Sequence, residues 1–256
     1  EIMMLTKMTP HGGSFRDPAG VLSEVDGRIF RSLTPQGERQ MHATLNSRVI
    51  QRFTSQSRWI ETQFVEPGVV EHPRIFFPSY PFEWTSEMLF EAGSLTLDLA
   101  EQLLDESMGL KDASAWNILF EGPQAKFVDA RWLAFGQFAR HFLNPLIAAK
   151  YFSLRTDSVF LRSVDGLCPE EIYRMAGWWL RLSPSFLPLI SVPTWASGLT
   201  KRFVTRDPRV GTEKEAKFIL RTLFKQLRRT LVALKPKSSR SRWTGYQQSE
   251  ISYGDH

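Results

Sequence analysis

The hydrophobic pattern of this chain changes once, near Ser86, and this change limits the folds that the sequence can adopt. Before Ser86, apolar residues come in short runs separated by turn residues, which is typical of short strands, with one helical stretch among them. After Ser86, apolar residues recur every three or four positions, which predicts amphipathic helices. We therefore predict an α+β fold, with a small β-rich lobe at 1–80 and a larger helical lobe at 81–236.

The β-rich part contains one hairpin and one helix with clear boundary signals. Asp26-Gly27 separates two short apolar runs, 21–25 and 28–32, and an Asp-Gly pair in this position is a strong hairpin signal. Thr34-Pro35 has the pattern of an N-cap followed by a first-turn proline. Apolar residues at four-residue spacing then continue one helical face as far as Phe53.

The remaining elements are predicted from the same kinds of signal. They are extended segments at 59–65 and 74–79, a helix from Ser86 to near Gly109, strands at 117–120 and 125–128, and helices near 135–152, 169–182 and 212–235. In the last helix we expect seven apolar residues to face inward: Ile219, Leu220, Leu223, Phe224, Leu227, Leu231 and Leu234. We expect its basic residues to face outward: Lys217, Arg221, Lys225, Arg228 and Arg229.

The composition excludes several classes of protein. The hydrophobic fraction of 42% and the charged fraction of 23% are ordinary for a globular chain. The most apolar stretch, 178–199, is interrupted by Arg181 and three prolines, so we predict no membrane span. A single cysteine, Cys168, excludes an internal disulfide and a cysteine-based zinc site, which fits a cytoplasmic protein.

The charge is distributed unevenly along the chain. Residues 200–242 contain 14 Lys and Arg against three Asp and Glu, whereas the rest of the chain has an acidic excess. A basic segment of this kind suits a solvated helix face, a nucleic acid, an anionic membrane surface or an acidic neighbouring domain. It lacks the interleaved aromatics of a single-strand binding platform, so we expect no nucleic-acid partner.

The stretch from Asp112 to Asp129 carries the most chemical information. Asp112 precedes Asn117 by five residues on a loop after a long predicted helix, and a predicted hairpin then leads to Asp129. In phosphoryl transfer, one carboxylate orients the nucleophile, while an amide oxygen and a second carboxylate bind magnesium beside the phosphates. Asp112 is therefore a candidate catalytic residue, and Asn117 and Asp129 are candidate metal ligands. Taken singly, each residue has a simpler explanation as a loop or turn residue.

Residues 112–129 resemble the catalytic loop and metal-binding Asp of the protein-kinase-like superfamily, especially its small-molecule and sugar kinases. The resemblance implies a two-lobed fold that binds ATP and magnesium, with residues 79–84 at the hinge between lobes. Glu83 is then expected near the adenine, through the adjacent backbone. Arg31 is the residue expected to contact the phosphates, because no Lys occurs between Lys7 and Lys111.

A second resemblance extends over nearly the whole chain. Segments 14–20, 80–84, 110–117 and 137–143 are similar to the kinase-like N-terminal region of a bacterial family of class I SAM-dependent methyltransferases, which includes nodulation-type methyltransferases. The resemblance implies that 237–256 is a polar linker toward a methyltransferase domain, and that SAM would bind only in that domain. The expected partners are this domain, in cis or in trans, and a sugar or lipid-linked glycan.

The departures from the kinase pattern leave two functions open. Arg31 stands where a kinase has Lys, and Asp129-Ala130-Arg131 stands where a kinase has Asp-Phe-Gly. Arg and Lys bind phosphate differently, so the contact between the protein and the nucleotide phosphates is expected to differ from that of a typical kinase. The chain is then either a divergent kinase that phosphorylates a small hydroxyl substrate, or a silent module that positions substrate or the methyltransferase.

The remaining conspicuous residues have structural explanations. His141 lies on a predicted helix beside aromatic residues and is expected to be a hydrogen-bonded structural histidine. Trp178, Trp179 and Trp195 are expected in the core or at an interface, and Cys168 is expected to be a partly buried thiol at a helix start. His11, His42 and His72 lack the spacing for a shared metal site.

Overall fold

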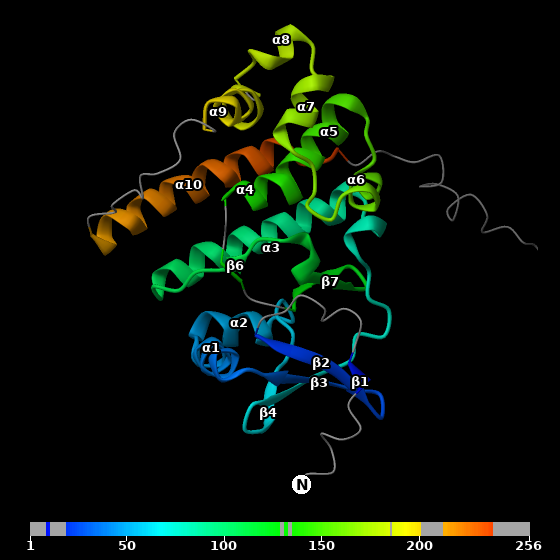
Figure 1. Cartoon of the computed structure of the whole chain (residues 1–256), viewed down its shortest axis with the longest axis vertical. Helices are drawn as coiled ribbons and strands as arrows, with labels where there is room; N and C mark the ends of the chain where they lie inside the picture. Colours follow the sequence, from blue (N-terminus) through cyan, green and yellow to red (C-terminus); the bar gives the residue numbers. More distant parts are fainter. Residues whose placement is uncertain are drawn as a thin grey trace, which may run out of the picture.

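The computed structural model describes residues 9–10, 19–128, 131–132, 135–184, 186–200 and 212–237. An antiparallel sheet lies at one end of the molecule and helices make up most of the remainder, as Figure 1 shows. The predicted α+β class is therefore confirmed. The sheet region comprises residues 9–10 and 19–72, and the helical region comprises the described residues of 86–237.

The sheet region contains five strands in the order β1-β2-β3-β5-β4, with every neighbouring pair antiparallel. The strands are β1 (Thr9–Pro10), β2 (Gly20–Val25), β3 (Arg28–Leu33), β4 (Gln63–Glu66) and β5 (Val69–His72). The predicted hairpin is confirmed: Val25 pairs with Arg28, and Asp26 and Gly27 have φ angles of 51° and 76°. Two positive φ values in succession give the turn type that matches the twist of a two-residue hairpin.

Ser47 divides the predicted first helix into α1 (Pro35–Asn46) and α2 (Arg48–Ser55). The N-cap at Thr34 is confirmed, since its hydroxyl accepts a hydrogen bond from the Gly37 N–H at 3.1 Å. Ser47 has extended backbone angles, and its hydroxyl accepts a hydrogen bond from the Ile50 N–H at 3.2 Å. Side-chain capping at Ser47 therefore ends the continuous helical face that the apolar spacing predicted.

The second extended segment was predicted in the wrong place. The strand after β4 is β5 at Val69–His72, reached through a turn in which Gly68 has a φ of 73°. Residues 74–79 follow the sheet as a connection and include one isolated bridge, between Ser79 and Phe120. Pro73 and Pro78 have no backbone N–H, so they cannot donate the hydrogen bonds that pairing with another strand would need.

The long helix α3 (Ser86–Asp105) lies at the centre of the helical region and buries eleven of its residues. It is preceded by η3 (Pro81–Glu83) and followed by the short strand β6 (Lys111–Asp112), which pairs with β9 (Arg131–Trp132). Between these two strands lie η4 (Ala115–Asn117) and the hairpin of β7 (Ile118–Glu121) and β8 (Gln124–Phe127). This hairpin agrees with the predicted strands to within one or two residues.

The rest of the helical region is built from shorter helices than the sequence indicated. The segment predicted at 135–152 is continuous but contains a π-helical turn, and the segment at 169–182 is interrupted at Ala176 and Gly177. The elements are α4 (Phe135–Phe138), η5 (Ala139–Leu143), α5 (Asn144–Phe152), α6 (Thr156–Arg162), α7 (Pro169–Met175), α8 (Trp178–Arg181), η6 (Leu187–Ser191), α9 (Val192–Thr200) and α10 (Glu213–Ala233).

The amphipathic pattern of α10 is correct in its C-terminal half and wrong near its start. Phe224, Leu227 and Leu231 are buried against the helical region, as predicted. Ile219, predicted to face inward, is instead 57% exposed, and Phe218 beside it is 71% exposed. The first turns of α10 contact the end of α3, where Glu213 accepts a hydrogen bond from the Ser107 hydroxyl and Lys217 donates one to the same hydroxyl. Phe218 and Ile219 are not covered by this contact.

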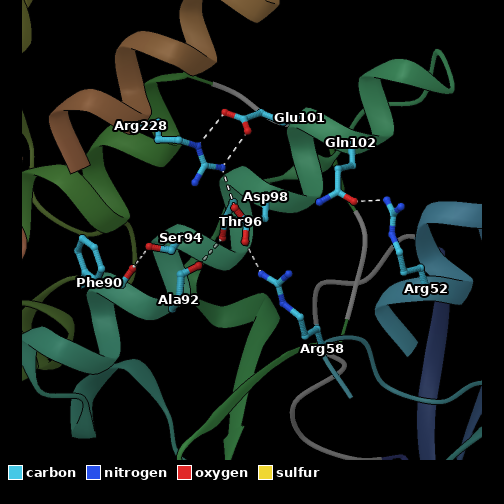
Figure 2. Close-up of polar contacts among 10 residues, drawn as sticks. All are labelled: Arg52, Arg58, Phe90, Ala92, Ser94, Thr96, Asp98, Glu101, Gln102 and Arg228. Carbon is cyan, nitrogen blue, oxygen red and sulfur yellow. Dashed lines mark hydrogen bonds and ion pairs between the residues drawn. The ribbon is translucent and has the colours of Figure 1, made fainter. Parts of the chain in front are cut away.

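Ion pairs tie α10 to α3, and they correct the prediction that Arg228 faces mainly outward. Arg228 is half-buried and bonds to Asp98 at 2.7 Å and to Glu101 at 2.9 Å. Arg58, from the segment after α2, binds the same Asp98 at 2.5 Å (Figure 2). Arg221 likewise pairs with Asp105 at 2.8 Å. The acidic face of α3 therefore neutralises part of the basic C-terminal segment.

Candidate ligand-binding cleft

A cleft of about 360 Å³ opens between the sheet region and the η4–β7–β8 segment. The sheet contributes side chains from β2, β3 and β5, and the connection at 73–80 closes one side. The lining residues are Leu22, Glu24, Ile29, Arg31, Ile60, His72, Pro73, Arg74, Ile75, Phe76, Pro78, Tyr80, Trp116, Asn117, Leu119 and Val128. Its size lies in the range of small-molecule sites, and most of its lining is apolar.

The pleat of the sheet explains which side chains face the cleft. Leu22 pairs with Arg31 across β2 and β3, and Ile29 pairs with His72 across β3 and β5. Residues two apart in a strand share one face, so Ile29 and Arg31 lie on the same side of β3. The sheet thus presents an apolar surface to the cleft, with one arginine and one histidine in it.

Arg31 is buried, with 6% of its surface exposed, and it lies close enough to His72 to influence that residue's titration. Burial, together with the nearby Arg31 charge, lowers the pKa of His72 to about 4. The Nδ1 atom of His72 is also 3.0 Å from the Thr62 hydroxyl. At neutral pH the histidine is therefore uncharged, and Arg31 is the cation on this wall of the cleft.

Asn117 lies on the opposite wall, at the end of η4. Its carbonyl accepts a hydrogen bond from the Val128 N–H at 2.9 Å, which joins η4 to the end of β8. The structure thus brings two of the sequence-predicted residues, Arg31 and Asn117, to the lining of one cleft. Leu119 lies in β7, two residues after Asn117, and adds an apolar side chain to the same wall.

The other two members of the predicted catalytic group are described less completely. The backbone of Asp112 belongs to β6 and pairs with that of Arg131 in β9. Asp129 lies outside the described residues, although its neighbour Val128 is bonded to Asn117. Among the described residues no group of three His, Cys, Asp or Glu gathers as a metal site, and Asn117 is one of the oxygen-bearing side chains that line the cleft. A magnesium site shared with Asp129 stays a prediction.

Glu83 caps a helix beside the cleft. Its carboxylate accepts a hydrogen bond from the Tyr80 N–H at 2.8 Å and so closes the first turn of η3. Tyr80 lines the cleft, whereas Glu83 is not among the described residues that do so. The cofactor-binding role expected for Glu83 stays a prediction, and its observed contact positions the backbone of the connection.

Two hydrogen bonds behind η4, one of them buried, hold the wall that carries Asn117. The Nδ1 atom of His141 accepts a hydrogen bond from the Ala115 N–H at 3.4 Å, and burial lowers the pKa of His141 to about 4. The Trp116 indole donates to the Val164 carbonyl at 2.8 Å, which fixes η4 to the segment before α7. The prediction that His141 is a hydrogen-bonded structural histidine is confirmed.

An ion pair lies at the edge of the cleft, where the connection leaves the sheet. Arg74 pairs with Glu24 of β2 at 2.6 Å, and the ring of Phe76 lies beneath the Arg74 guanidinium. Arg74 and Arg31 are the two arginines that line the cleft. The arrangement suits a ligand with a flat apolar part and an anionic part.

Sequence reasoning missed most of the cleft lining. His72 was considered only as a metal ligand, and the apolar residues Leu22, Ile29 and Leu119 were not considered as binding residues. The two-residue period in 20–24 and 28–32 could have placed Leu22, Ile29 and Arg31 on one face of the sheet. No local signal in the sequence places Leu119 opposite that face.

Comparison with known proteins gives one relationship of moderate strength. No protein-family model matches the chain. The chain is similar to the nodulation protein NoeA of Rhizobium meliloti (strain 1021), with 28% identity over 184 residues, which is 64% of this chain. Those residues make up 38% of that protein, so this chain spans well under half of its relative. The match supports the predicted similarity to nodulation-type proteins.

Proposed function

We propose that this chain is a kinase-like domain that binds a magnesium–nucleotide complex in the cleft between the sheet and β7. The observation that supports this most is the joint presence of Arg31 and Asn117 in one cleft with apolar side chains from both walls. Leu22 and Leu119 would contact the faces of a nucleobase, and Arg31 would contact the phosphates through its planar guanidinium.

The chemistry proposed for this site is phosphoryl transfer to a hydroxyl group. Magnesium, when bound, neutralises phosphate charge, and Asn117 and Asp129 would hold it. Asp112 would accept the proton of the attacking hydroxyl, while the γ-phosphoryl group leaves ADP and joins the acceptor oxygen. A sugar or a lipid-linked glycan is the proposed acceptor, in a cytoplasmic setting.

A silent module is the second candidate, and one observation favours it. Arg31 lines the cleft, and the resemblance to kinases expects a Lys in its place, so the proposed phosphate contact differs in geometry and hydrogen bonding from that of a typical kinase. In this version the domain binds its ligand without turnover and positions substrate or a partner methyltransferase domain. SAM would then belong to that partner and not to the cleft described above.

Binding is tested by the melting temperature of the chain with and without Mg-ATP. A ligand at about a hundredfold excess over its Kd stabilises the folded state by about 2.7 kcal/mol, a shift of several degrees. We expect Arg31→Lys to reduce the shift, and Asn117→Ala and Asp129→Asn to abolish its magnesium-dependent part. Arg155→Ala is the matched control, because this arginine is exposed and distant in sequence from the cleft lining.

Measuring the release of ADP distinguishes the active kinase from the silent module. An active kinase would release ADP from Mg-ATP when supplied with a suitable sugar, and Asp112→Asn would stop release while keeping the thermal shift. A silent module would show the shift and no release above that of Asp112→Asn. No thermal shift with any magnesium–nucleotide complex would refute both versions.

A further inference from the structure

A second cavity, of about 490 Å³, lies between α3, the segment that follows it and the first half of α10. We call it the α3–α10 pocket; its lining residues are Ala100, Leu104, Ser107, Met108, Gly109, Leu110, Glu213, Ala216, Lys217, Leu220 and Phe224. These residues are separate from those that line the cleft. The two helices have 20 and 21 residues, and no described helix is long and apolar enough to span a membrane. The volume of the pocket lies in the range of small-molecule sites.

The two helices give the pocket an elongated shape, because they lie side by side and antiparallel (Figure 1). Lys217, near the start of α10, donates to the Ser107 hydroxyl at 2.7 Å, just after α3 ends. Arg228, about three turns later in α10, pairs with Glu101 within α3. On α10 the lining extends over 213–224, which is a rise of about 16 Å along the helix. A cavity of this shape suits an extended ligand better than a compact one.

Apolar side chains form most of the lining. They belong to Ala100, Leu104, Met108, Leu110, Ala216, Leu220 and Phe224. Leu110 and Phe224 are also part of the hydrophobic core, with 1% and 4% of their surface exposed. The small residues Ala100, Gly109 and Ala216 leave space that longer side chains would fill. An alkyl chain that leaves water for such a surface is stabilised by the hydrophobic effect, so the lining favours an aliphatic ligand.

The polar residues of the pocket gather at the end where α10 begins. The Ser107 hydroxyl donates to the Glu213 carboxylate at 2.9 Å and accepts from Lys217, and Lys217 also pairs with Glu213 at 3.0 Å. Arg221 and Asp105, next along the two helices, pair with each other at 2.8 Å. Because these charges cancel in pairs, this end is complementary to an uncharged polar group, such as the hydroxyl and ether oxygens of a sugar.

The pocket adjoins the strand that contains Asp112. Leu110 lines the pocket, and Lys111 and Asp112 follow it directly as β6. Two residues of extended chain span about 7 Å, so the backbone of Asp112 lies within about 7 Å of that of Leu110. A ligand held in the pocket by its alkyl chain would therefore have its polar part close to the residue proposed as the base.

We propose that the α3–α10 pocket binds the alkyl chain of a lipid-linked sugar, with the sugar at the Ser107 end. The lining accounts for the chain, and the paired charges account for an uncharged head. Use of that sugar as the phosphoryl acceptor rests on the proposed function, whereas binding of the alkyl chain does not. The pocket then distinguishes a lipid-linked sugar from the free sugar, which lacks the part that the pocket holds.

The test is isothermal titration calorimetry of the whole protein chain with decyl maltoside, kept below its critical micelle concentration, and with maltose. We expect decyl maltoside to bind with a negative heat-capacity change, because apolar surface is buried. Maltose should bind at least about tenfold more weakly, since it lacks the alkyl chain.

A variant that fills the pocket identifies the place of binding. Ala216 is only partly buried, so Ala216→Phe is expected to fold, and its ring would occupy space that the alkyl chain needs. This variant should bind decyl maltoside at least about tenfold more weakly. Thr222→Phe is the matched control, because it adds a ring at an exposed position of the same helix outside the lining. It should bind as the unaltered chain does.

The other outcomes are distinct from one another. Equal loss in both variants, or absence of decyl maltoside binding by the unaltered chain, would overturn the proposal. Decanoate that binds more tightly than decyl maltoside, and less tightly in Lys217→Ala, would overturn it in favour of a free fatty acid. Dimerisation that only Ala216→Phe loses, without binding of decyl maltoside, would overturn it in favour of self-association. Binding of decyl maltoside without any thermal shift from Mg-ATP would support the pocket and refute the proposed function.

Discussion

The cleft and the apical patch both expose aromatic side chains, and they differ in what lies behind those side chains. The apical patch is the exposed surface formed by Met175, Trp178, Trp179, Leu182, Val192 and Trp195. The wall of the cleft at η4 is tied to neighbouring elements by the contacts of His141 with Ala115 and of Trp116 with Val164. In the apical patch, Trp178 and Trp179 stack on each other and are mostly exposed. A site that recognises a ligand by shape needs a fixed wall, whereas exposed side chains without such ties contribute little to stability.

This difference predicts that substitutions behind the cleft reduce stability much more than substitutions in the patch. The largest effect is expected at Gly166, which has a φ of 74° and whose added Cβ would lie 2.3 Å from the Arg140 carbonyl oxygen. Gly166→Ala should lower the free energy of unfolding by about 2–4 kcal/mol, measured by chemical denaturation.

Gly136→Ala is the matched control for Gly166→Ala, because no atom of the described residues lies within 4 Å of an added Cβ there and the residue is in α4. It should leave stability unchanged or raise it by up to about 1 kcal/mol. Equal effects of the two substitutions would mean that the segment behind the cleft is not held as described.

The second prediction concerns pH. Burial lowers the pKa of His141 from 6.5 to about 4, so the unfolded chain binds a proton in that interval that the folded chain does not. Stability is therefore highest above pH 6.5 and falls as the pH drops toward 4, by up to about 3 kcal/mol for this residue. His141→Gln should remove this share of the pH dependence, measured as the free energy of unfolding at several pH values.

His72 contributes a pH dependence of the same sign, because its pKa is also lowered to about 4. The His141→Gln variant should therefore keep a reduced slope. A full slope in His141→Gln would show that His141 is not buried as an uncharged group.

The third prediction addresses the ion pairs that join α3 to its neighbours. Asp98 binds both Arg58 and Arg228, so Asp98→Asn removes the shared acidic partner of two half-buried arginines. We expect a loss of about 1–2 kcal/mol in the free energy of unfolding, larger at low salt. Arg155→Ala breaks a pair whose arginine is 83% exposed, and its effect is expected to be much smaller because solvent screens the pair.

The smallest effect is expected in the patch itself. Trp178→Ala/Trp179→Ala should lower the free energy of unfolding by less than about 1 kcal/mol, since both rings are already in water and lose mainly their mutual stacking. It should leave the thermal shift with Mg-ATP unchanged. A loss as large as that at Gly166 would show that the patch supports the fold, and the contrast with the cleft would fail.

The predictions from sequence succeeded where a short segment carries its own boundary signals. The Asp26-Gly27 turn, the Thr34 cap and the helix from Ser86 are set by residues next to them in the chain. The prediction of one continuous helix to Phe53 was wrong, because the apolar spacing passes through Ser47 without change. Its hydroxyl donates to Glu106, a residue 59 positions later, and no local pattern reports that contact.

The sequence by itself determined the order of sheet and helices, the hairpins, and the presence of Asp112, Asn117 and Asp129 as chemically suited residues. Only the tertiary structure decided that Arg31 and Asn117 share a cleft, that Arg228 faces α3, and that Trp178 and Trp179 lie at the surface. Propensity and turn chemistry act between neighbours in the chain, whereas burial depends on which distant segment covers a side chain. An aromatic or basic residue has the same local pattern whether a partner element covers it or not.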